Sequence, residues 1–522
     1  MADNFLYLTR IGIDTYQHAV VFMRKDCHVC RAEGFNAMTQ VRVCTNKKSI
    51  TATLITVSET FLSHQQAGLS DVAWQMLEAE EGEVVQFSHA PAVDSMSYVR
   101  GKLYGEELTD QSACAIVEDI KKGNYSDVQL AAFVAACADD RLSVDETIAL
   151  TRAMVNSGER FTWPQSFVLD KHCVGGLPGN RTTPIVTAII AANGFTMPKT
   201  SSRAITSPAG TADTMETMTP VALSFEHMKT VIESQGACLA WGGSVSLSPI
   251  DDIIIRIERA LDLDSEGQLV ASVISKKVAA GSTHVLIDIP VGPSAKVRTY
   301  DKAKKLSHHL VATGFALGIH VETIITDGNQ PVGQGIGPAL EAHDVLAVLR
   351  NEEDAPQDLI ARSLTLAARL LKMAAQGGSA FDGRLKDSRL KDSLGDASDD
   401  VYLGLATETL QSGQAYEKFL MICQAQGGFK EPGTAPYKQT LFAANNGTVN
   451  YFNNRFIAKF ASLAGAPNAP LAGLKMHVRL GDKIKKGQAL LTLYAEAQGE
   501  LDYALEFYHS HPEAIRINKE VL

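Results

Sequence analysis

The segment Asp170–Thr183 reads DKHCVGGLPGNRTT and brings two cations, a glycine-rich turn and two hydroxyl groups into fourteen residues. The short, largely apolar run Ser166–Leu169 before it is strand-like, and the run Pro184–Ala192 after it is typical of a buried helix. A strand, a glycine loop and a helix N-terminus direct backbone N–H groups toward one point, and Lys171 adds a full positive charge. The segment therefore predicts an α/β unit with an anion site, for which phosphate is the natural ligand.

The motif alone leaves a structural alternative open. Glycine-rich turns between a strand and a helix also serve packing, and the spacing matches neither the dinucleotide-binding fingerprint nor the P-loop. A second polar segment, Lys199–Glu216, follows about one β-α unit later and contains seven Ser or Thr hydroxyls, two cations and a glycine. A polar surface loop with Thr211 or Asp213 as a helix cap would have a similar composition. Two donor-rich loops at successive strand ends favour a ligand site instead, because α/β sheets bind ligands there.

The composition is that of a soluble enzyme with several domains. The chain has 522 residues, 45% of them hydrophobic, which is enough for about three domains with their own cores. A net charge of -11 argues against a general nucleic-acid binder. The sequence contains no apolar run of about 18 residues that would span a membrane and no secretory signal at its start. We therefore expect a cytoplasmic protein without nucleic-acid or membrane partners.

Eight cysteines are scattered along the chain, and only Cys27 and Cys30 have metal-like spacing. A single C-x-x-C lacks the second pair that a structural zinc site requires, so no metal site is predicted. The pair is also not expected at the start of a helix in a clear βαβ context, which argues against a redox role. Reduced, mostly buried thiols are the expectation.

The fold class predicted is α+β with several domains: a β-rich N-terminal domain (1–95), a helical domain (96–165), a central α/β domain (166–430) and a C-terminal α+β domain (431–522). Short runs rich in β-branched residues mark the first domain, at 6–8, 19–23, 41–44, 52–57 and 84–87. In the second, Thr109 and Ser126 are expected helix caps. Residues from about 237 to 284, which contain a helix-like segment with Ser272 and Lys276, are expected to return to the helical domain.

Several motifs together resemble the family of thymidine phosphorylases and AMP phosphorylases. They are Asp170–Gly176, Ser201–Glu216, Ala271–Lys277, Ile325–Pro331, Gly413–Phe419 and Ala425–Gly428. The resemblance covers roughly residues 100 to 510, and the β-rich block before it is the kind of extension that AMP phosphorylases carry. Such enzymes cleave the N-glycosidic bond of a nucleoside or nucleotide with phosphate and give a free base and a sugar 1-phosphate. The resemblance implies inorganic phosphate as co-substrate, no cofactor, and a homo-oligomer.

The resemblance also implies which residues form the site. Phosphate is expected to contact Lys171, Cys173, Gly175, Gly176, Thr183, Ser201 and Thr211. Cys173 departs from the pattern, since thymidine phosphorylases have Ser there and a thiol is the weaker donor. The expected substrate-binding residues are Gly176, Ser202, Arg203, Ala204, Ile205, Thr206, Ser207, Thr211, Ser272, Lys276 and Lys296. Catalytic roles are expected for Lys171, for His172, which could equally be a structural histidine, and for Asp264.

Substrate identity depends on a second departure. Thymidine phosphorylases carry an Arg-Asp pair upstream of the S-x-x-x-K helix to grip the pyrimidine, whereas Arg256 and Arg259 here are not followed by Asp. The acidic stretch 261–267 comes next, and AMP phosphorylases look similar there. In that branch an Asp matching Asp264 is the proposed proton donor to the leaving base, although a helix cap ahead of Gly267 is the alternative.

These observations predict a phosphorylase of a nucleoside 5′-monophosphate, AMP-like, that releases the base and ribose 1,5-bisphosphate. Thymidine phosphorolysis is the close alternative. A non-catalytic nucleotide-binding regulator, which would keep the phosphate loops without an acid for the leaving group, is the alternative from another class.

Overall fold

The computed structural model describes residues 5–16, 18–58, 61–204, 207–245, 247–261, 263, 265–376 and 398–518. The chain divides into two compact units. The first consists of residues 1–141 and 256–264, and the second of residues 142–255 and 265–522. Helix α10 (Pro249–Leu261) crosses from the second unit into the first.

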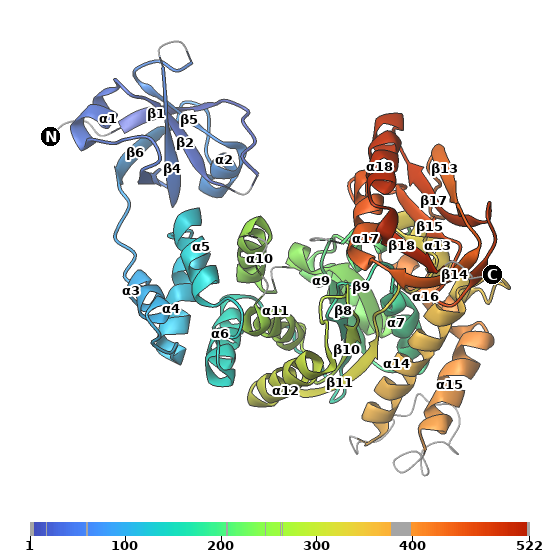
Figure 1. Cartoon of the computed structure of the whole chain (residues 1–522). Helices are drawn as coiled ribbons and strands as arrows, with labels where there is room; N and C mark the ends of the chain where they lie inside the picture. The colour runs from blue at the N-terminus through green and yellow to red at the C-terminus, as the bar shows by residue number, and fades with distance from the viewer. Residues whose placement is uncertain are drawn as a thin grey trace. The chain divides into compact units, whose positions relative to one another are not determined.

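The first unit begins with a closed β-barrel, drawn in blue in Figure 1. Its strands lie in the order β1-β5-β2-β4-β3-β6, and they span Phe5–Arg10 (β1), Val20–Arg24 (β2), Gln40–Cys44 (β3), Ser49–Val57 (β4), Gln66–Leu69 (β5) and Val84–His89 (β6). Alternate side chains such as Leu6, Leu8, Val41 and Val43 are buried in its core because successive residues of a strand point to opposite faces. The β-branched runs of the sequence correspond to all of these strands except β5.

Two short helices complete the barrel, α1 (His28–Glu33) and α2 (Asp71–Leu77). Cys27 is the N-cap of α1 and Ser70 is the N-cap of α2. The pair therefore does lie at a helix start, contrary to expectation, but not in a βαβ unit, because β2 and β3, which flank α1, are not neighbours in the barrel. A helix of six residues is too short to show a helical period in the sequence.

Helices follow the barrel in the first unit: α3 (Met96–Leu103), α4 (Asp110–Lys121) and α5 (Asp127–Ala136). Thr109 and Ser126 cap α4 and α5 as predicted, and each forms a capping box with the residue three positions later. Arg256 of α10 binds Asp127 through both terminal nitrogens, at 2.9 and 2.8 Å.

The second unit contains a parallel sheet built from β7 (Leu169–Cys173), β8 (Met197–Ser201), β9 (Ala237–Trp241), β10 (His284–Val291) and β11 (His320–Asp327). Three strands pair in the order β11-β10-β7, β8 pairs with β9, and a parallel bridge between Val168 and Thr196 connects the two groups. Strand β9 therefore belongs to this sheet, although its residues fall in the segment expected to return to the helical domain. The predicted limits of the domains stay a prediction.

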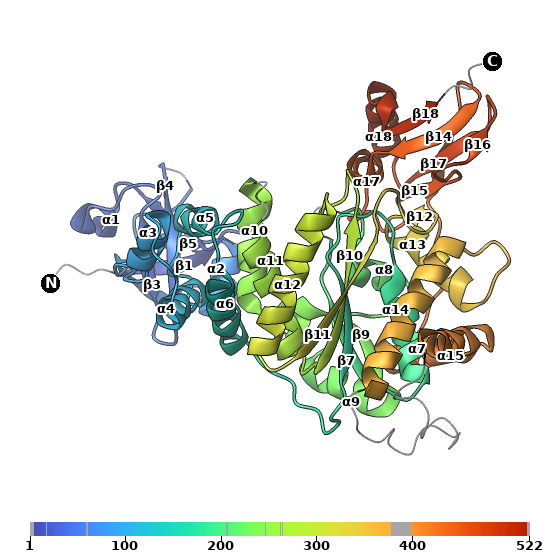
Figure 2. The same ribbon diagram turned by 60° about the horizontal axis from the view of Figure 1, so that its bottom comes forward.

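Helices cover both faces of this sheet, as Figure 2 shows for α12 and α14. The helices of this region are α6 (Val144–Ser157), α7 (Thr182–Ala192), α8 (Thr211–Glu216), α9 (Phe225–Gln235), α11 (Glu266–Ala279), α12 (Tyr300–Ala316), α13 (Pro338–Leu349), α14 (Gln357–Gln376), α15 (Asp399–Gln411) and α16 (Gln414–Ala425), with a 3-10 turn at Gly242–Val245. Helix α7 is buried from Thr182 to Ala191, which explains why its sequence is apolar on every side.

The C-terminal part has its own core, packed between two small sheets and two helices. Its elements are β12 (Gly335–Ile336), β13 (Tyr437–Phe442), β14 (Gly447–Phe452), α17 (Asn454–Leu463), β15 (Gly473–Met476), β16 (Lys483–Ile484), β17 (Ala489–Ala495), α18 (Gln498–Ser510), a 3-10 turn at Pro512–Ala514 and β18 (Ile515–Asn518). The sheets have the orders β12-β15-β17-β13 and β16-β14-β18. The molecule is thus the multidomain mixture of α and β structure that the sequence predicts.

None of the helices in the described part of the chain is long and apolar enough to cross a membrane.

Candidate active site

Strand β7 carries the first group of site residues, and this corrects the sequence interpretation. The expected strand Ser166–Leu169 is displaced, because the regular strand spans Leu169–Cys173 and includes Lys171 and His172. The glycine-rich turn therefore begins only at Val174. Alternation along the strand places Lys171 and Cys173 on one face, and Asp170 and His172 on the other.

Lys171 is fully buried at the heart of this group. Its Nζ donates a hydrogen bond to Oγ1 of Thr182 at 2.6 Å. Burial lowers the pKa of Lys171, while the neighbouring Cys173 and Asp288 oppose that change. A buried ammonium group is costly unless it is paired or hydrogen-bonded. The hydrogen bond to Thr182 offsets part of that cost.

Asp288 lies on β10 beside β7 and connects three site elements. Its carboxylate accepts hydrogen bonds from Thr326 Oγ1 at 2.5 Å and from Asn180 Nδ2 at 3.3 Å. The amide of Asn180 also lies 3.3 Å from Cys173 Sγ, toward which it donates. Burial raises the pKa of Cys173 to about 11, so that this side chain is a neutral thiol at physiological pH.

The glycine turn requires glycine at two neighbouring positions. Gly175 and Gly176 have φ of 88° and 77°, which L side chains rarely adopt. A Cβ on Gly176 would lie only 2.5 Å from the backbone N of Lys296, whereas a Cβ on Gly175 would meet nothing within 4 Å. The fold thus brings Gly176 and Lys296 together, and their role in substrate binding stays a prediction. Gly175 faces open space, which leaves its backbone accessible to a ligand.

Thr182 and Thr183 begin helix α7, and both are buried. The N-cap of this helix is Arg181, whose side chain makes no capping hydrogen bond. An uncapped helix start offers backbone N–H groups and the positive end of the helix dipole to an anion. The expected phosphate contact at Thr183 is consistent with this position.

The second donor-rich loop connects β8 to α8. Ser201 closes β8, and its Oγ is buried without a hydrogen-bond partner among the described residues. Thr211 opens α8, and its Oγ1 accepts a hydrogen bond from Arg181 at 2.7 Å. Arg181 also donates to Glu341 Oε2 at 2.6 Å and to the carbonyl of Ala209 at 3.0 Å. Arg181 therefore joins the two loops.

Arg203 is engaged within its own loop. Its guanidinium binds Glu216 and Asp213 and stacks over the Trp241 ring at 4.8 Å. The Asp213 carboxylate accepts hydrogen bonds from the N–H groups of Ala204, at 2.6 Å, and Gly210, at 2.8 Å. Asp213 thus fixes the loop that contains Ser202, Ala204 and Ser207. Ile205 and Thr206 lie outside the described residues.

Ser272 and Lys276 lie on α11, as the sequence predicts, one helical turn apart. The Nζ of Lys276 lies 2.5 Å from Oδ2 of the buried Asp251 on α10. Val273 and Ile274 of the same helix share an apolar cluster with Val174 of the glycine turn. The helix is thereby packed against the turn. Its N-cap is Ser265, and the expected proton donor Asp264 lies outside the described residues.

His172 lies beside a buried charge cluster on the opposite face of β7. Asp170 is paired with Lys277 at 2.8 Å and with Lys199 at 3.4 Å. Burial and the charges of Lys277 and Lys199 hold the pKa of His172 well below its usual value. His172 is therefore a neutral imidazole at physiological pH.

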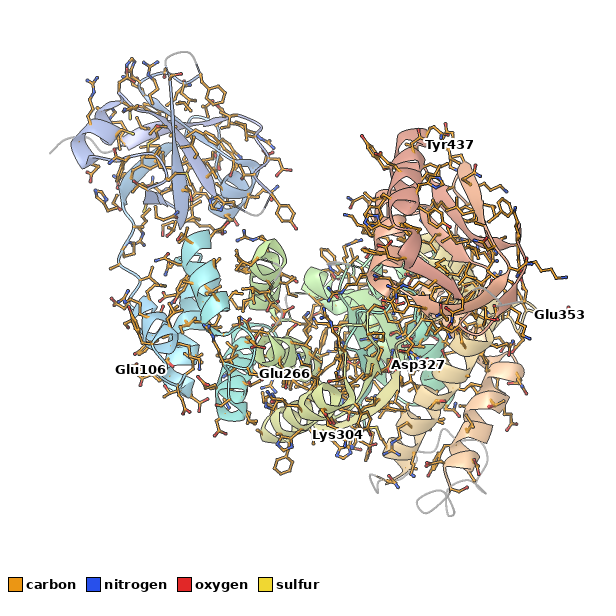
Figure 3. The ribbon with its side chains drawn as sticks, in the orientation of Figure 1. Glu106, Glu266, Lys304, Asp327, Glu353 and Tyr437 are labelled. Carbon is orange, nitrogen blue, oxygen red and sulfur yellow. The ribbon has the colours of Figure 1, made fainter. Side chains whose placement is uncertain are left out.

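Some residues of the site were not among the sequence candidates: Asn180, Arg181, Thr182, Asp288, Thr326 and Glu341. Asp288 could have been singled out from the sequence, because it is a charged residue within the apolar run of β10. A carboxylate buried in such a strand needs partners. Thr326 lies in a motif already singled out, next to Asp327, which ends β11 (Figure 3). The partnership of Arg181 with Glu341, separated by 160 residues, has no signal in the sequence.

The parallel sheet thus carries donor-rich loops at the ends of β7 and β8, the edge where α/β folds bind their ligands. Three family models match the chain: "Glycosyl transferase family, helical bundle domain" at residues 96–158, "Glycosyl transferase family, a/b domain" at 165–397, and "Pyrimidine nucleoside phosphorylase C-terminal domain" at 448–513. The anthranilate phosphoribosyltransferase of Thermus thermophilus has a similar fold, with a TM-score of 0.50 and 18% identity over 63% of this chain and 98% of that one.

Relatives over the full length make the family specific. A protein of Hahella chejuensis named "Putative thymidine phosphorylase" is 61% identical and covers 99% of both chains. Proteins with the same name from Polaromonas sp. and Legionella pneumophila are 52% and 49% identical, over 99% and 98% of this chain and 97% and 95% of theirs. The chain belongs to the thymidine phosphorylase family, and it is a pentosyltransferase of the phosphorylase type.

Proposed function

We propose that this enzyme cleaves the N-glycosidic bond of a nucleoside 5′-monophosphate, AMP-like, with inorganic phosphate, and releases the base and ribose 1,5-bisphosphate. The observation that carries the choice of substrate is the position of Arg256. Both of its terminal nitrogens bind Asp127, so Arg256, one of two arginines in the region where thymidine phosphorylases resemble this chain but carry an Arg-Asp pair, is already occupied. The resemblance of the acidic stretch 261–267 and of the N-terminal β-barrel extension to AMP phosphorylases also favours an AMP-like substrate.

The phosphate half of the proposal rests on donors that can bind a further acceptor. The Lys171 ammonium is buried and donates to Thr182, the Ser201 hydroxyl is buried without a partner among the described residues, and the start of α7 has no side-chain cap. Charge-assisted hydrogen bonds from such groups hold a phosphate without a metal ion. Phosphate held there would be fixed for attack on the anomeric carbon of a bound nucleotide.

The second half of the proposal concerns the base that departs when the N-glycosidic bond breaks. Positive charge develops on the sugar as the bond breaks, and the base departs more easily if it is protonated. We assign that proton to Asp264 as a hypothesis taken from the resemblance. His172 is a poor proton donor, because its lowered pKa keeps the imidazole neutral. Ser272 and Lys276, on the helix packed against the glycine turn, would contact the nucleotide.

Thymidine phosphorolysis remains the second candidate, because relatives that are 49–61% identical over nearly the whole chain carry that name. A panel of substrates separates the two. The purified protein is incubated with AMP, CMP, UMP, adenosine, uridine and thymidine, with and without phosphate, and free base is measured. The proposal expects release of adenine from AMP that requires phosphate. Preference for thymidine over every monophosphate would replace it with the second candidate.

Lys171→Ala is the matched test of the phosphate site. Because the variant loses a charged donor inside the site, we expect turnover to fall by about 100-fold or more. Near-normal kinetics at limiting phosphate would contradict this role for Lys171. A wild-type enzyme that binds AMP but releases no base would instead support the nucleotide-binding regulator.

A further inference from the structure

Cys27 and Cys30 occupy a position that the phosphorylase reaction does not use. They lie in the β-barrel of the first unit, immediately after β2, and both side chains are buried. Cys27 is the N-cap of α1, and Cys30 is the third residue of that helix. Residues three apart on a helix lie on the same face, so the two thiols are neighbours.

The hydrogen bonds around Cys27 orient its sulfur toward the helix. The backbone N–H of Cys30 donates to Cys27 Sγ at 3.3 Å, and the N–H of Arg31 donates to the Cys27 carbonyl at 3.1 Å. Helix α2 of the same barrel has an ordinary cap, in which Ser70 Oγ accepts from Ala73 at 3.4 Å. A serine therefore suffices as a helix cap in this domain, and serine and threonine are common cap residues in general. The reactivity of a thiol at position 27 is therefore not needed for capping the helix.

The electrostatics of the pair are asymmetric. A hydrogen bond from the Cys30 thiol, together with the N–H groups of the first turn, lowers the pKa of Cys27 to about 6. The same hydrogen bond, burial and the charge of Asp26 raise the pKa of Cys30. Cys27 is thus the sulfur of the pair that loses its proton more readily. A thiolate is the nucleophilic form of cysteine, and a neighbouring thiol can resolve the product of its oxidation.

Among the described residues, no group of three or more His, Cys, Asp or Glu side chains could hold a metal ion. Cys27 and Cys30 are not joined by a disulfide in the structure.

We propose that Cys27 and Cys30 form a reversible dithiol–disulfide couple that reacts with hydroperoxides, with Cys27 as the attacking sulfur and Cys30 as the resolving one. The Cys27 thiolate attacks one oxygen of hydrogen peroxide, the O–O bond breaks, and Cys27 becomes a sulfenic acid, while the other oxygen leaves as hydroxide and is protonated to water. The Cys30 sulfur then displaces the sulfenic hydroxyl, which departs as a second water. In balance, two thiols and one hydrogen peroxide give one disulfide and two waters.

Because both thiols are buried, the proposal requires that helix α1 opens locally. Helix α1 has six residues, and the outward side chains His28 and Arg31 are exposed. Helices this short are marginal by themselves and open locally at low cost in free energy. An oxidant as small as hydrogen peroxide needs only such an opening to reach Cys27.

The test uses the reduced full-length protein, hydrogen peroxide below stoichiometric amounts, alkylation of the remaining thiols, and trypsin. Cleavage after Lys25 and Arg31 places both cysteines in one peptide, Asp26–Arg31. We expect this peptide to lose two hydrogens before Cys114, which is exposed on α4, is oxidised. Dithiothreitol should reverse the change. A peptide that stays reduced while Cys114 is oxidised would overturn the proposal.

Variants separate the two roles. Cys27→Ser keeps a capping oxygen, so the barrel should fold, and oxidation at this site should slow by about tenfold or more because the thiolate is lost. Cys30→Ser should yield no internal disulfide but a sulfenic acid at Cys27, which dimedone traps. Cys114→Ser is the matched control and should leave disulfide formation unchanged. Equal peroxide consumption by Cys27→Ser and the wild type would contradict Cys27 as the attacking sulfur.

Discussion

The guanidinium of Arg181 donates a hydrogen bond to Oγ1 of Thr211 at 2.7 Å, and thereby joins the start of α7 to the start of α8. Because the Thr211 oxygen accepts from Arg181, its own hydroxyl hydrogen is free to point toward another acceptor. Arg181 is held in turn by Glu341, which is 1% exposed. This relationship makes Arg181 a positioning residue for an expected phosphate contact.

The first prediction concerns Arg181→Lys. A lysine keeps the charge opposite Glu341 but cannot reach Glu341, Thr211 and Ala209 at once. We expect the KM for phosphate to rise by about tenfold, with a smaller change in the KM for the nucleotide. Steady-state kinetics with each substrate varied in turn measures both values. If both KM values and the thermal stability change together, the role of Arg181 is structural only.

The second prediction concerns Ser201→Ala. The Ser201 Oγ is buried and lacks a partner among the described residues, so its removal costs the free protein nothing in hydrogen bonds. We expect an unchanged or slightly higher melting temperature, together with a several-fold higher KM for phosphate. Thr214→Ala is the control within the same loop region, because Thr214 already donates to the Gly210 carbonyl at 3.2 Å. A lower melting temperature with an unchanged KM would contradict the phosphate contact.

The third prediction concerns Cys173→Ser. The thiol has a pKa of about 11 and accepts a hydrogen bond from Asn180, and a hydroxyl can replace it in that contact while donating more strongly. We expect the KM for phosphate to stay the same or to fall. Cys173→Ala, which lacks a donor, is the comparison. If the Ser and Ala variants behave alike, position 173 does not contact phosphate.

The fourth prediction concerns pH and Asp344 on α13. Burial raises the pKa of this carboxyl from its ordinary value of 3.8 to about 6, although it accepts hydrogen bonds from the N–H groups of Gln334 and Gly335. A raised pKa in the folded state means that the contribution to stability is complete below pH 3.8 and is lost as the pH rises through about 6. This change corresponds to about 3 kcal/mol.

Asp344→Asn should remove this dependence, because the amide does not titrate. We expect the melting temperature of the wild type, relative to that of the variant, to fall between pH 4 and pH 7. Differential scanning calorimetry of both proteins across this range checks it. A constant difference between the two melting temperatures would show that Asp344 titrates at its ordinary value.

The sequence identified the elements around the site where the local signal was strong. The apolar run behind Thr183 is a buried helix, Thr109 and Ser126 cap helices, and Ser272 and Lys276 share one helix. Each of these depends on residues within a few positions of one another, which is the range over which helical periodicity and capping act. The position of β7 was missed, because the charged residues Asp170 and Lys171 do not look like a buried strand.

The amino-acid sequence by itself determined the family, the α/β unit with its glycine turn, and the candidate donors at its strand ends, since these follow from local pattern and motif. Only the tertiary structure decided which donors are already occupied. Arg203 is bound to Glu216, Arg256 to Asp127 and Arg181 to Glu341, whereas Ser201 has no partner among the described residues. It also revealed that Cys27 caps a helix. The physical reason is that a hydrogen bond depends on distance in space, and partners 160 residues apart, such as Arg181 and Glu341, meet only when the sheet has folded.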